Sequence, residues 1–339
     1  MLIRPELLYI NAMPRKILFF LIFALIFCVT LTISCEKKKN DAQQQQAPQS
    51  KVNVVATIFP LYDFAKATAK EHANIAMLIL PGASIHSFEP SPADIKNIQS
   101  ADMFLYIGGE NDAWVERILS TLDTSKMKIV RLFDYIKLYE EEEIDHNHRH
   151  NHKHKEKGEI KIEYDEHIWT SPKNAALMLE AIAKAFCEID SSNCESYGKN
   201  SESYISQIAE LSSELSQITN SAKRKKIVVA DRFPFLYLTK EYELDYVAAF
   251  SGCSDQADAS AATIAFLIKA IKKDKIPYVY HVELSNKNTA KTVAEQTGSK
   301  MLLLHSYHNI SKQDFESGAT YLDLFKQNVE NLKIGLSEE

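Results

Sequence analysis

Five histidines crowd into one short segment of the chain, and they are the first residues whose types and spacing could do chemistry. They alternate with polar residues and follow an acidic run, Glu140 to Glu143, with almost nothing apolar to pack. Histidine-rich tracts bind transition metals weakly and in many arrangements, and imidazole favours zinc, copper or nickel over manganese or calcium. We therefore expect an auxiliary metal-binding loop over about 140–164, with a merely solvated charged loop as the alternative. Its histidines are His146, His148, His150, His152 and His154.

Other candidate ligands stand singly, at positions where an α/β fold places its ligands. Open α/β sheets bind ligands just beyond the carboxyl ends of their strands. Taken alone, each such residue is more commonly a surface or core residue, but four of them at loop mouths in two lobes indicate a metal site. They are His86, after a strand expected over 75–80; His167, before a helix expected from 172; Asp231, after a strand expected over 227–230; and His305, after a strand expected over 301–304.

The elements that position these residues follow from an alternation of short apolar runs with helical stretches. This pattern predicts an α/β fold with parallel sheets covered on both faces. In the first half we expect strands over 52–58, 75–80, 103–107 and 128–132, and helices over 61–71, 92–99, 114–122 and 172–187. In the second half we expect strands over 227–230, 246–250, 278–282 and 301–304, with helices between them and a final helix over about 318–333.

A long polar stretch over 195–226 separates these two sets. Apolar residues recur along it at helical spacing, which gives one apolar stripe and predicts a single long helix. We interpret this helix as a rigid connector between an N-terminal lobe over 51–194 and a C-terminal lobe over 227–339. The alternative is an ordinary surface helix within one lobe.

The start of the chain resembles a lipoprotein signal. Arg15 and Lys16 precede an apolar run over 17–33, which ends at Ser34-Cys35, so we expect a signal peptide over 1–35 with Cys35 acylated. Residues 36–50 are rich in Lys, Gln and Asn and predict a flexible tether. The alternative is an uncleaved transmembrane anchor, although the apolar run is short for one. Both readings place the rest of the chain outside the cytoplasm, anchored to a membrane.

The remaining cysteines fit an oxidising compartment. Cys187 and Cys194 flank a short polar stretch and are spaced to pair as a disulfide. Cys253 is left over, and we interpret it as a small buried apolar residue rather than as a soft metal ligand.

Two stretches resemble signatures of a known family. His86-Ser-Phe-Glu-Pro-Ser-Pro-Ala-Asp94 and Asp165-Glu-His167-Ile-Trp-Thr-Ser-Pro172 are similar to those of the cluster A-I solute-binding proteins of metal ABC transporters, of ZnuA and TroA type. Residues 298–304, Tyr321 and Asn328 resemble the C-terminal stretch of that family. The resemblance covers about residues 52–334 and implies two α/β lobes joined by a long helix, with one metal between them.

Carried over by position, the resemblance makes His86 and His167 two of the ligands. At the other two positions the chain departs from the family: Asp231 stands where His is usual, and His305 where Asp is usual. Three imidazoles and one carboxylate remain a plausible tetrahedral zinc shell. Several alternatives stay open: His308 in place of or beside His305, Arg232 at the position given to Asp231, Asp231 pairing with Arg232, and Glu283 as a ligand or as a carboxylate that supports one.

The function that these features indicate is an extracytoplasmic binding lipoprotein, expected as a monomer, that captures Zn²⁺ and delivers it to an ABC import permease. A net charge of −6 gives no basic surface for nucleic acid. Manganese as the cargo, or a surface adhesin that merely holds metal, are the alternatives. A zinc hydrolase is disfavoured, because the sequence has no His-Glu-x-x-His helix, Gly-x-Ser-x-Gly elbow or phosphate loop.

Overall fold

The structure is a computed structural model that describes residues 51–83, 88–142, 144, 163–252, 254 and 258–337. Several sequence expectations lie outside these residues. They are the signal over 1–35 with Cys35, the tether over 36–50, His86, the five histidines from His146 to His154, and Cys253.

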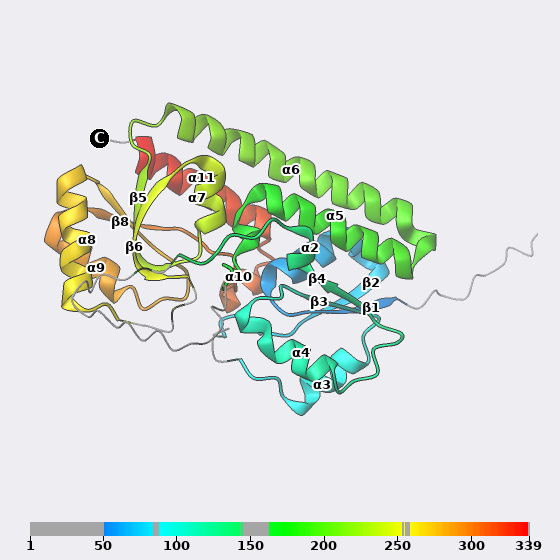
Figure 1. Ribbon diagram of the computed structural model, residues 1–339. Coiled ribbons are helices and arrows are strands. Elements are labelled where there is room, and N and C mark those ends of the chain that lie inside the picture. Colours follow the sequence, from blue (N-terminus) through cyan, green and yellow to red (C-terminus); the bar gives the residue numbers. More distant parts are fainter. Residues whose placement is uncertain are drawn as a thin grey trace, which may run out of the picture. The chain divides into compact units, whose positions relative to one another are not determined.

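The N-terminal lobe is built on a four-stranded parallel sheet in the order β2-β1-β3-β4. Its strands are β1 (Val52–Ala56), β2 (Ala73–Met77), β3 (Met103–Tyr106) and β4 (Lys128–Arg131). Helices α2 (Phe59–Ala69) and α5 (Pro172–Ile189) cover one face, while α3 (Pro92–Gln99) and α4 (Ala113–Leu119) cover the other (Figure 1). Every residue of β3 is buried, as expected of a central parallel strand with helices on both faces.

The C-terminal lobe repeats this plan with the order β6-β5-β7-β8, again all parallel. Its strands are β5 (Lys226–Phe233), β6 (Asp245–Ser251), β7 (Tyr278–His281) and β8 (Lys300–Leu303). Helices α8 (Ala261–Asp274) and α9 (Asn288–Thr297) pack on one face. The other face joins α7 (Leu236–Tyr242) and α11 (Tyr321–Ser337) in a core that both lobes share. The predicted α/β class with two lobes is confirmed.

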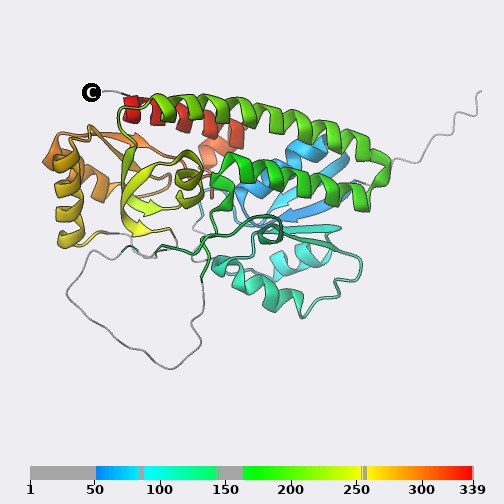
Figure 2. The ribbon, with the colours of Figure 1, turned by 45° about the horizontal axis from the view of Figure 1, so that its top comes forward.

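The long helix expected between the lobes is α6 (Cys194–Ser221), which ends five residues before the predicted boundary at 226. It ends there because the backbone of Ala222 is already extended, and Lys226 then begins β5. Figures 1 and 2 both show α6 running alongside α5 of the first lobe and α11 of the second. Its Tyr204 hydroxyl donates to Asp63 of α2, and Ser212 pairs with Tyr242 of α7 at 2.8 Å. The helix therefore contacts both lobes.

The end of β5 and the start of α11 differ from the boundaries expected from the sequence. Strand β5 continues through Asp231 and Arg232 to Phe233, where Pro234 ends it, and its pairing with β6 shifts between Val229 and Arg232. Such a shift inserts an extra residue and re-aims the side chains after it. Near the C-terminus, a short helix α10 (Lys312–Glu316) was not predicted, and α11 begins at Tyr321 after Gly318, whose φ is +80°.

Across the described ranges, no helix combines the length and apolar character needed to cross a membrane.

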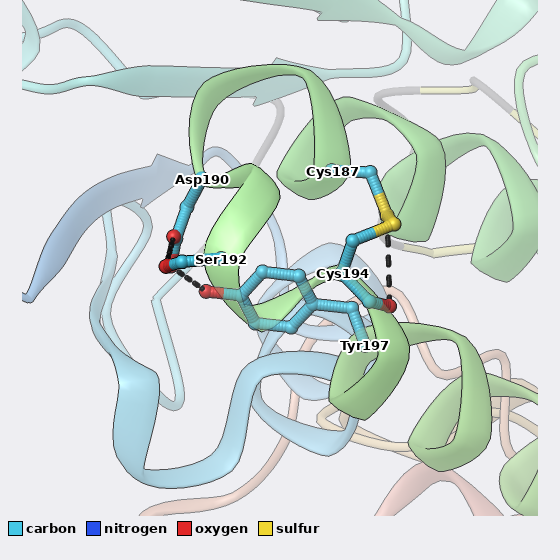
Figure 3. The surroundings of a disulfide bond; sticks show 5 residues. All are labelled: Cys187, Asp190, Ser192, Cys194 and Tyr197. Atoms are coloured by element: carbon cyan, nitrogen blue, oxygen red, sulfur yellow. Dashed lines mark hydrogen bonds between the residues drawn. A yellow bond between two sulfur atoms is a disulfide. The ribbon is translucent and has the colours of Figure 1, made fainter.

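A disulfide joins the end of α5 to the start of α6 (Figure 3). Cys187 and Cys194 form it, and Asp190 lies between them in the turn. Asp190 accepts hydrogen bonds from Tyr197 at 2.6 Å and Asn193 at 2.7 Å, and from the Ser192 hydroxyl. Burial alone would raise the pKa of Asp190, but these bonds outweigh it and lower the pKa to about 2. The turn that reverses the chain is thus braced both covalently and by a carboxylate.

Asp63 connects three helices at the junction of the lobes. One oxygen of its carboxylate accepts the Tyr204 hydroxyl of α6 and also, at 3.1 Å, the backbone N–H of Tyr321 at the start of α11. Burial raises the pKa of Asp63 to about 6, although both hydrogen bonds lower it. At neutral pH the carboxylate is therefore ionised at a cost to stability.

Asp63→Asn should remove that cost, because the Asn side-chain oxygen can accept the same two hydrogen bonds. The folded pKa of about 6 lies above the unfolded value of about 3.9. Between these two pH values the unfolded state releases the proton first, so wild-type stability falls as pH rises. Urea unfolding should show the variant gaining about 2 kcal/mol on wild type between pH 4 and pH 7. If the difference in unfolding free energy between the variant and wild type does not change with pH, this role of Asp63 is contradicted.

Candidate metal site

His167 is buried in the N-terminal lobe, directly before the short helix η4 (Ile168–Thr170) that leads into α5. Its backbone N–H donates to Oδ1 of Asp165 at 2.8 Å, and its ring Nδ1 lies 3.2 Å from the same oxygen. A carboxylate that accepts from Nδ1–H leaves the lone pair of Nε2 for a metal. Burial lowers the pKa of His167, but the Asp165 carboxylate outweighs it and the net pKa is raised.

The ring of His308 meets His167 from the other lobe. His308 lies in the loop after β8, with its ring centroid 5.2 Å from that of His167 and 4.7 Å from that of Trp169. Both imidazoles line a cavity of about 200 Å³. The cavity's other walls come from Gly82, Ala83, Arg232, Pro234, Gly252, Val282, Glu283, Leu284, Ser306 and Asn309.

The loop that carries His308 is fixed by hydrogen bonds at Ser306. The Ser306 backbone N–H donates to Glu283 at 2.7 Å, and its hydroxyl donates to the other oxygen of the same carboxylate. The Ser306 hydroxyl in turn accepts the backbone N–H of His308 at 3.3 Å. Across the lobes, the indole N–H of Trp169 donates to the Ser306 carbonyl at 2.8 Å. Glu283 therefore positions His308 through Ser306.

Asn309 ties the same loop to the segment after β2. Its side-chain amide donates to the carbonyls of Leu80 at 3.0 Å and Ala83 at 2.7 Å. The Gly82 backbone N–H donates to the Ile310 carbonyl at 2.8 Å. The chain is thus anchored beside His308 up to Ala83, three residues before His86, which itself lies outside the described residues.

Asp231, which was expected to join His167, does not line this cavity. Its two carboxylate oxygens accept the backbone N–H groups of Arg232 at 2.9 Å and Val282 at 3.4 Å. Arg232, the next residue, lines the cavity instead. The shift in β5 pairing accounts for the exchange, because an inserted residue alters which side chains face the loop end of the strand.

His305 also lies elsewhere, against a second cavity that shares Glu283 with the first. Its Nδ1 accepts the backbone N–H of Tyr307 at 2.9 Å, and its own backbone N–H donates to Asn328 at 2.7 Å. An Nδ1 that accepts puts the ring proton on Nε2, so the neutral ring has no lone pair left for a metal. Within the described ranges, no group of three or more His, Cys, Asp or Glu residues is placed to bind a metal ion.

Gly252 lines the cavity and was not chosen from the sequence, whereas Arg232 had been kept as an alternative at the position given to Asp231. A Cβ on Gly252 would lie 2.9 Å from Cε1 of His167 and 3.0 Å from the Phe233 carbonyl oxygen, so only glycine fits against that ring. His308 had been kept only as an alternative to His305. Tyr307 between them has a φ of +61°, and this left-handed turn directs the chain so that the two imidazoles line different cavities.

Gly252→Ala should destabilise the protein, because the new methyl group must displace the buried His167 ring or the Phe233 backbone. We expect the free energy of unfolding to fall by about 1 to 3 kcal/mol. Gly198→Ala is the matched control: nothing lies within 4 Å of a Cβ at that position of α6, and alanine favours a helix by up to about 1 kcal/mol. Equal urea midpoints for the two variants would show that Gly252 does not pack against His167.

The comparisons with known proteins agree with this architecture. The family model described as "Zinc-uptake complex component A periplasmic" matches residues 54–335. The zinc-binding lipoprotein AdcA of Streptococcus pneumoniae is 32% identical over 315 residues, which cover 92% of this chain and 60% of the relative. The chain thus spans less than two thirds of that relative's length.

A second relative matches along almost its whole length. The high-affinity zinc uptake system protein ZnuA of Bacillus subtilis is 31% identical over 315 residues, covering 93% of this chain and 97% of the relative. Among solved structures, the Zn(II)-bound ZnuA-like domain of S. pneumoniae AdcA aligns with a TM-score of 0.70 and 29% identity. The alignment covers 85% of this chain and all of that domain.

Proposed function

The chain belongs to the zinc-uptake complex component A (ZnuA) family, and on this premise we propose that it captures Zn²⁺ outside the cytoplasm and delivers it to an ABC import permease. The observation that carries the proposal is the meeting of His167 and His308, from different lobes, in one small cavity. Two relatives whose names describe zinc binding or zinc uptake support zinc as the cargo.

The proposed ligands are His86, His167 and His308. For His167, the support is the Asp165 carboxylate, which orients the ring and leaves Nε2 toward a metal. For His308, the support is that its ring lies beside that of His167 and that a hydrogen bond to Ser306 fixes its loop. Asp231 and His305, the other residues expected from the sequence, have their oxygens or ring nitrogen engaged by backbone N–H groups.

His86 is included among the proposed ligands because of the family signature and because the chain from Ala83 is long enough to bring it to the cavity. The family signature that begins at this residue marks it as a ligand, and it lies outside the described residues. Ala83 lines the cavity and is fixed by Asn309. Three residues of chain span at most about 10 Å, which is enough to bring an imidazole from Ala83 to the cavity. With three imidazoles the site would suit zinc better than manganese, which favours more carboxylate oxygen.

The proposed setting is a lipid anchor at Cys35, with residues 36–50 as a tether to the membrane surface. One relative carries the word lipoprotein in its name, which supports the anchor. The family description as a component of a zinc-uptake complex supports a permease partner. A single chain suffices for the proposed site, because both lobes contribute to it, so the protein is proposed to act as a monomer without enzymatic turnover.

The histidine-rich segment is proposed to bind zinc weakly close to the main site. Its two ends pair with one another: the Glu141 N–H donates to the Glu163 carbonyl at 2.9 Å and the Asp165 N–H to the Tyr139 carbonyl at 3.0 Å. The Tyr237 hydroxyl of the C-terminal lobe donates to the Asp165 carbonyl at 2.9 Å. The segment thus ends three residues before His167, and its start is hydrogen-bonded beside that end.

Zinc titration of the soluble chain, in competition with a chromophoric chelator, tests the proposal. Wild type should bind one zinc tightly, with weaker binding by the histidine-rich segment. His308→Asn should weaken the tight site by more than about 100-fold, because losing a ligand costs more than losing a group that supports one. His305→Asn should stay within a few-fold of wild type, because the Asn oxygen can accept the Tyr307 N–H that His305 accepts.

Two results would count against the proposal in different ways. Absence of any tight zinc in wild type would overturn zinc capture itself. Loss of the tight site in His305→Asn but not in His308→Asn would keep zinc capture and reverse the ligand assignment. Thermal unfolding of both variants checks that each remains folded.

A further inference from the structure

Arg232 brings a positive charge to the wall of a cavity proposed to bind a cation. It lies near the end of β5 and lines the cavity together with His167 and His308. Its Nε donates to the Ser254 carbonyl, which orients the guanidinium and leaves the two terminal nitrogens for another partner. Among the described residues, no carboxylate forms an ion pair with this guanidinium.

The carboxylates around the cavity are already engaged by other groups. Both oxygens of Glu283 accept hydrogen bonds from Ser306, and both oxygens of Asp231 accept backbone N–H groups. Asp165 accepts both the backbone N–H and the ring of His167. The described wall therefore presents two imidazoles, the guanidinium of Arg232 and one carboxylate, Glu283, whose two oxygens already accept hydrogen bonds from Ser306.

Zn²⁺ in such a cavity would add two positive charges beside Arg232. Enclosing uncompensated charge away from water is costly, and a charge in a protein interior is normally paired. The three imidazoles proposed as ligands also leave a tetrahedral zinc one ligand short. An anion from solution would both offset the positive charge and supply the missing zinc ligand.

We propose that the cavity binds Zn²⁺ together with a small carboxylate-type anion, with one oxygen on the metal and the anion paired with the terminal nitrogens of Arg232. The inference rests on the proposed zinc function and names the form in which the cargo binds. A planar guanidinium matches the two oxygens of a carboxylate better than a point charge does. A cavity of about 200 Å³ has room for several waters of about 30 Å³ each, and so for a metal and an anion of three or four heavy atoms.

Zinc affinity of the soluble chain, measured with and without formate, tests this inference. The reference buffer is HEPES with perchlorate at equal ionic strength, and free Zn²⁺ is matched between the two. With 10 mM formate, wild type should bind zinc roughly tenfold more tightly, as linkage predicts for an anion whose Kd on the zinc-loaded protein is about 1 mM. Acetate and bicarbonate arms show which carboxylate-type anion gives the largest effect.

Arg232→Gln should bring the ratio of zinc affinities with and without formate to about one. Arg117→Gln is the matched control, since it removes the same charge from an exposed position on α4 and should keep the tenfold ratio. A direct readout that needs no variant is saturation-transfer NMR with formate, which should detect binding to zinc-loaded wild type and none to the metal-free protein.

The outcomes separate this inference from the function on which it rests. Tight zinc binding that formate does not change, or a tenfold ratio that persists in Arg232→Gln, would overturn the inference and leave zinc capture standing. Wild type that binds no zinc in either buffer would overturn both.

Discussion

The hydrogen bond from the Trp169 indole to the Ser306 carbonyl is the constraint on which the proposed site depends. Trp169 follows His167 by two residues, and Ser306 precedes His308 by two, so this one bond fixes the two imidazole-bearing segments relative to each other. The Trp169 carbonyl also accepts the Tyr321 hydroxyl of α11 at 2.8 Å. Because a buried donor without a partner costs about 1 to 3 kcal/mol, separating these segments is unfavourable.

Other contacts also stabilise the interface between the lobes. Asn309 bonds to the loop after β2, and Asp63 accepts from both α6 and α11. A buried core continuous across both lobes lies behind them. A site assembled before its ligand arrives loses less ordering entropy on binding, so we infer that capture of the metal needs only small movements of the lobes.

Much of the fold followed from the sequence, and the misjudged residues have identifiable physical causes. Apolar runs alternating with helical stretches predict both parallel sheets, and the stripe along α6 predicts the helix shared by the lobes. Asp231 was selected because β5 was expected to end at Ala230. The polar pair Asp231-Arg232 instead continues the strand, and a shift in pairing leaves Arg232 on the cavity. His305 was preferred to His308 because the left-handed turn at Tyr307 leaves no trace in a hydrophobic pattern.

Zinc K-edge X-ray absorption of the protein loaded with one equivalent of Zn²⁺ tests whether His167 and His308 bind the metal. A site that contains both residues should give nitrogen and oxygen scatterers at about 2.0 to 2.1 Å with imidazole multiple scattering. The imidazole signal should lose the contribution of one ring in His308→Asn and stay unchanged in His305→Asn. A sulfur scatterer at about 2.3 Å, or an imidazole signal that weakens in His305→Asn alone, would contradict a site formed by His167 and His308.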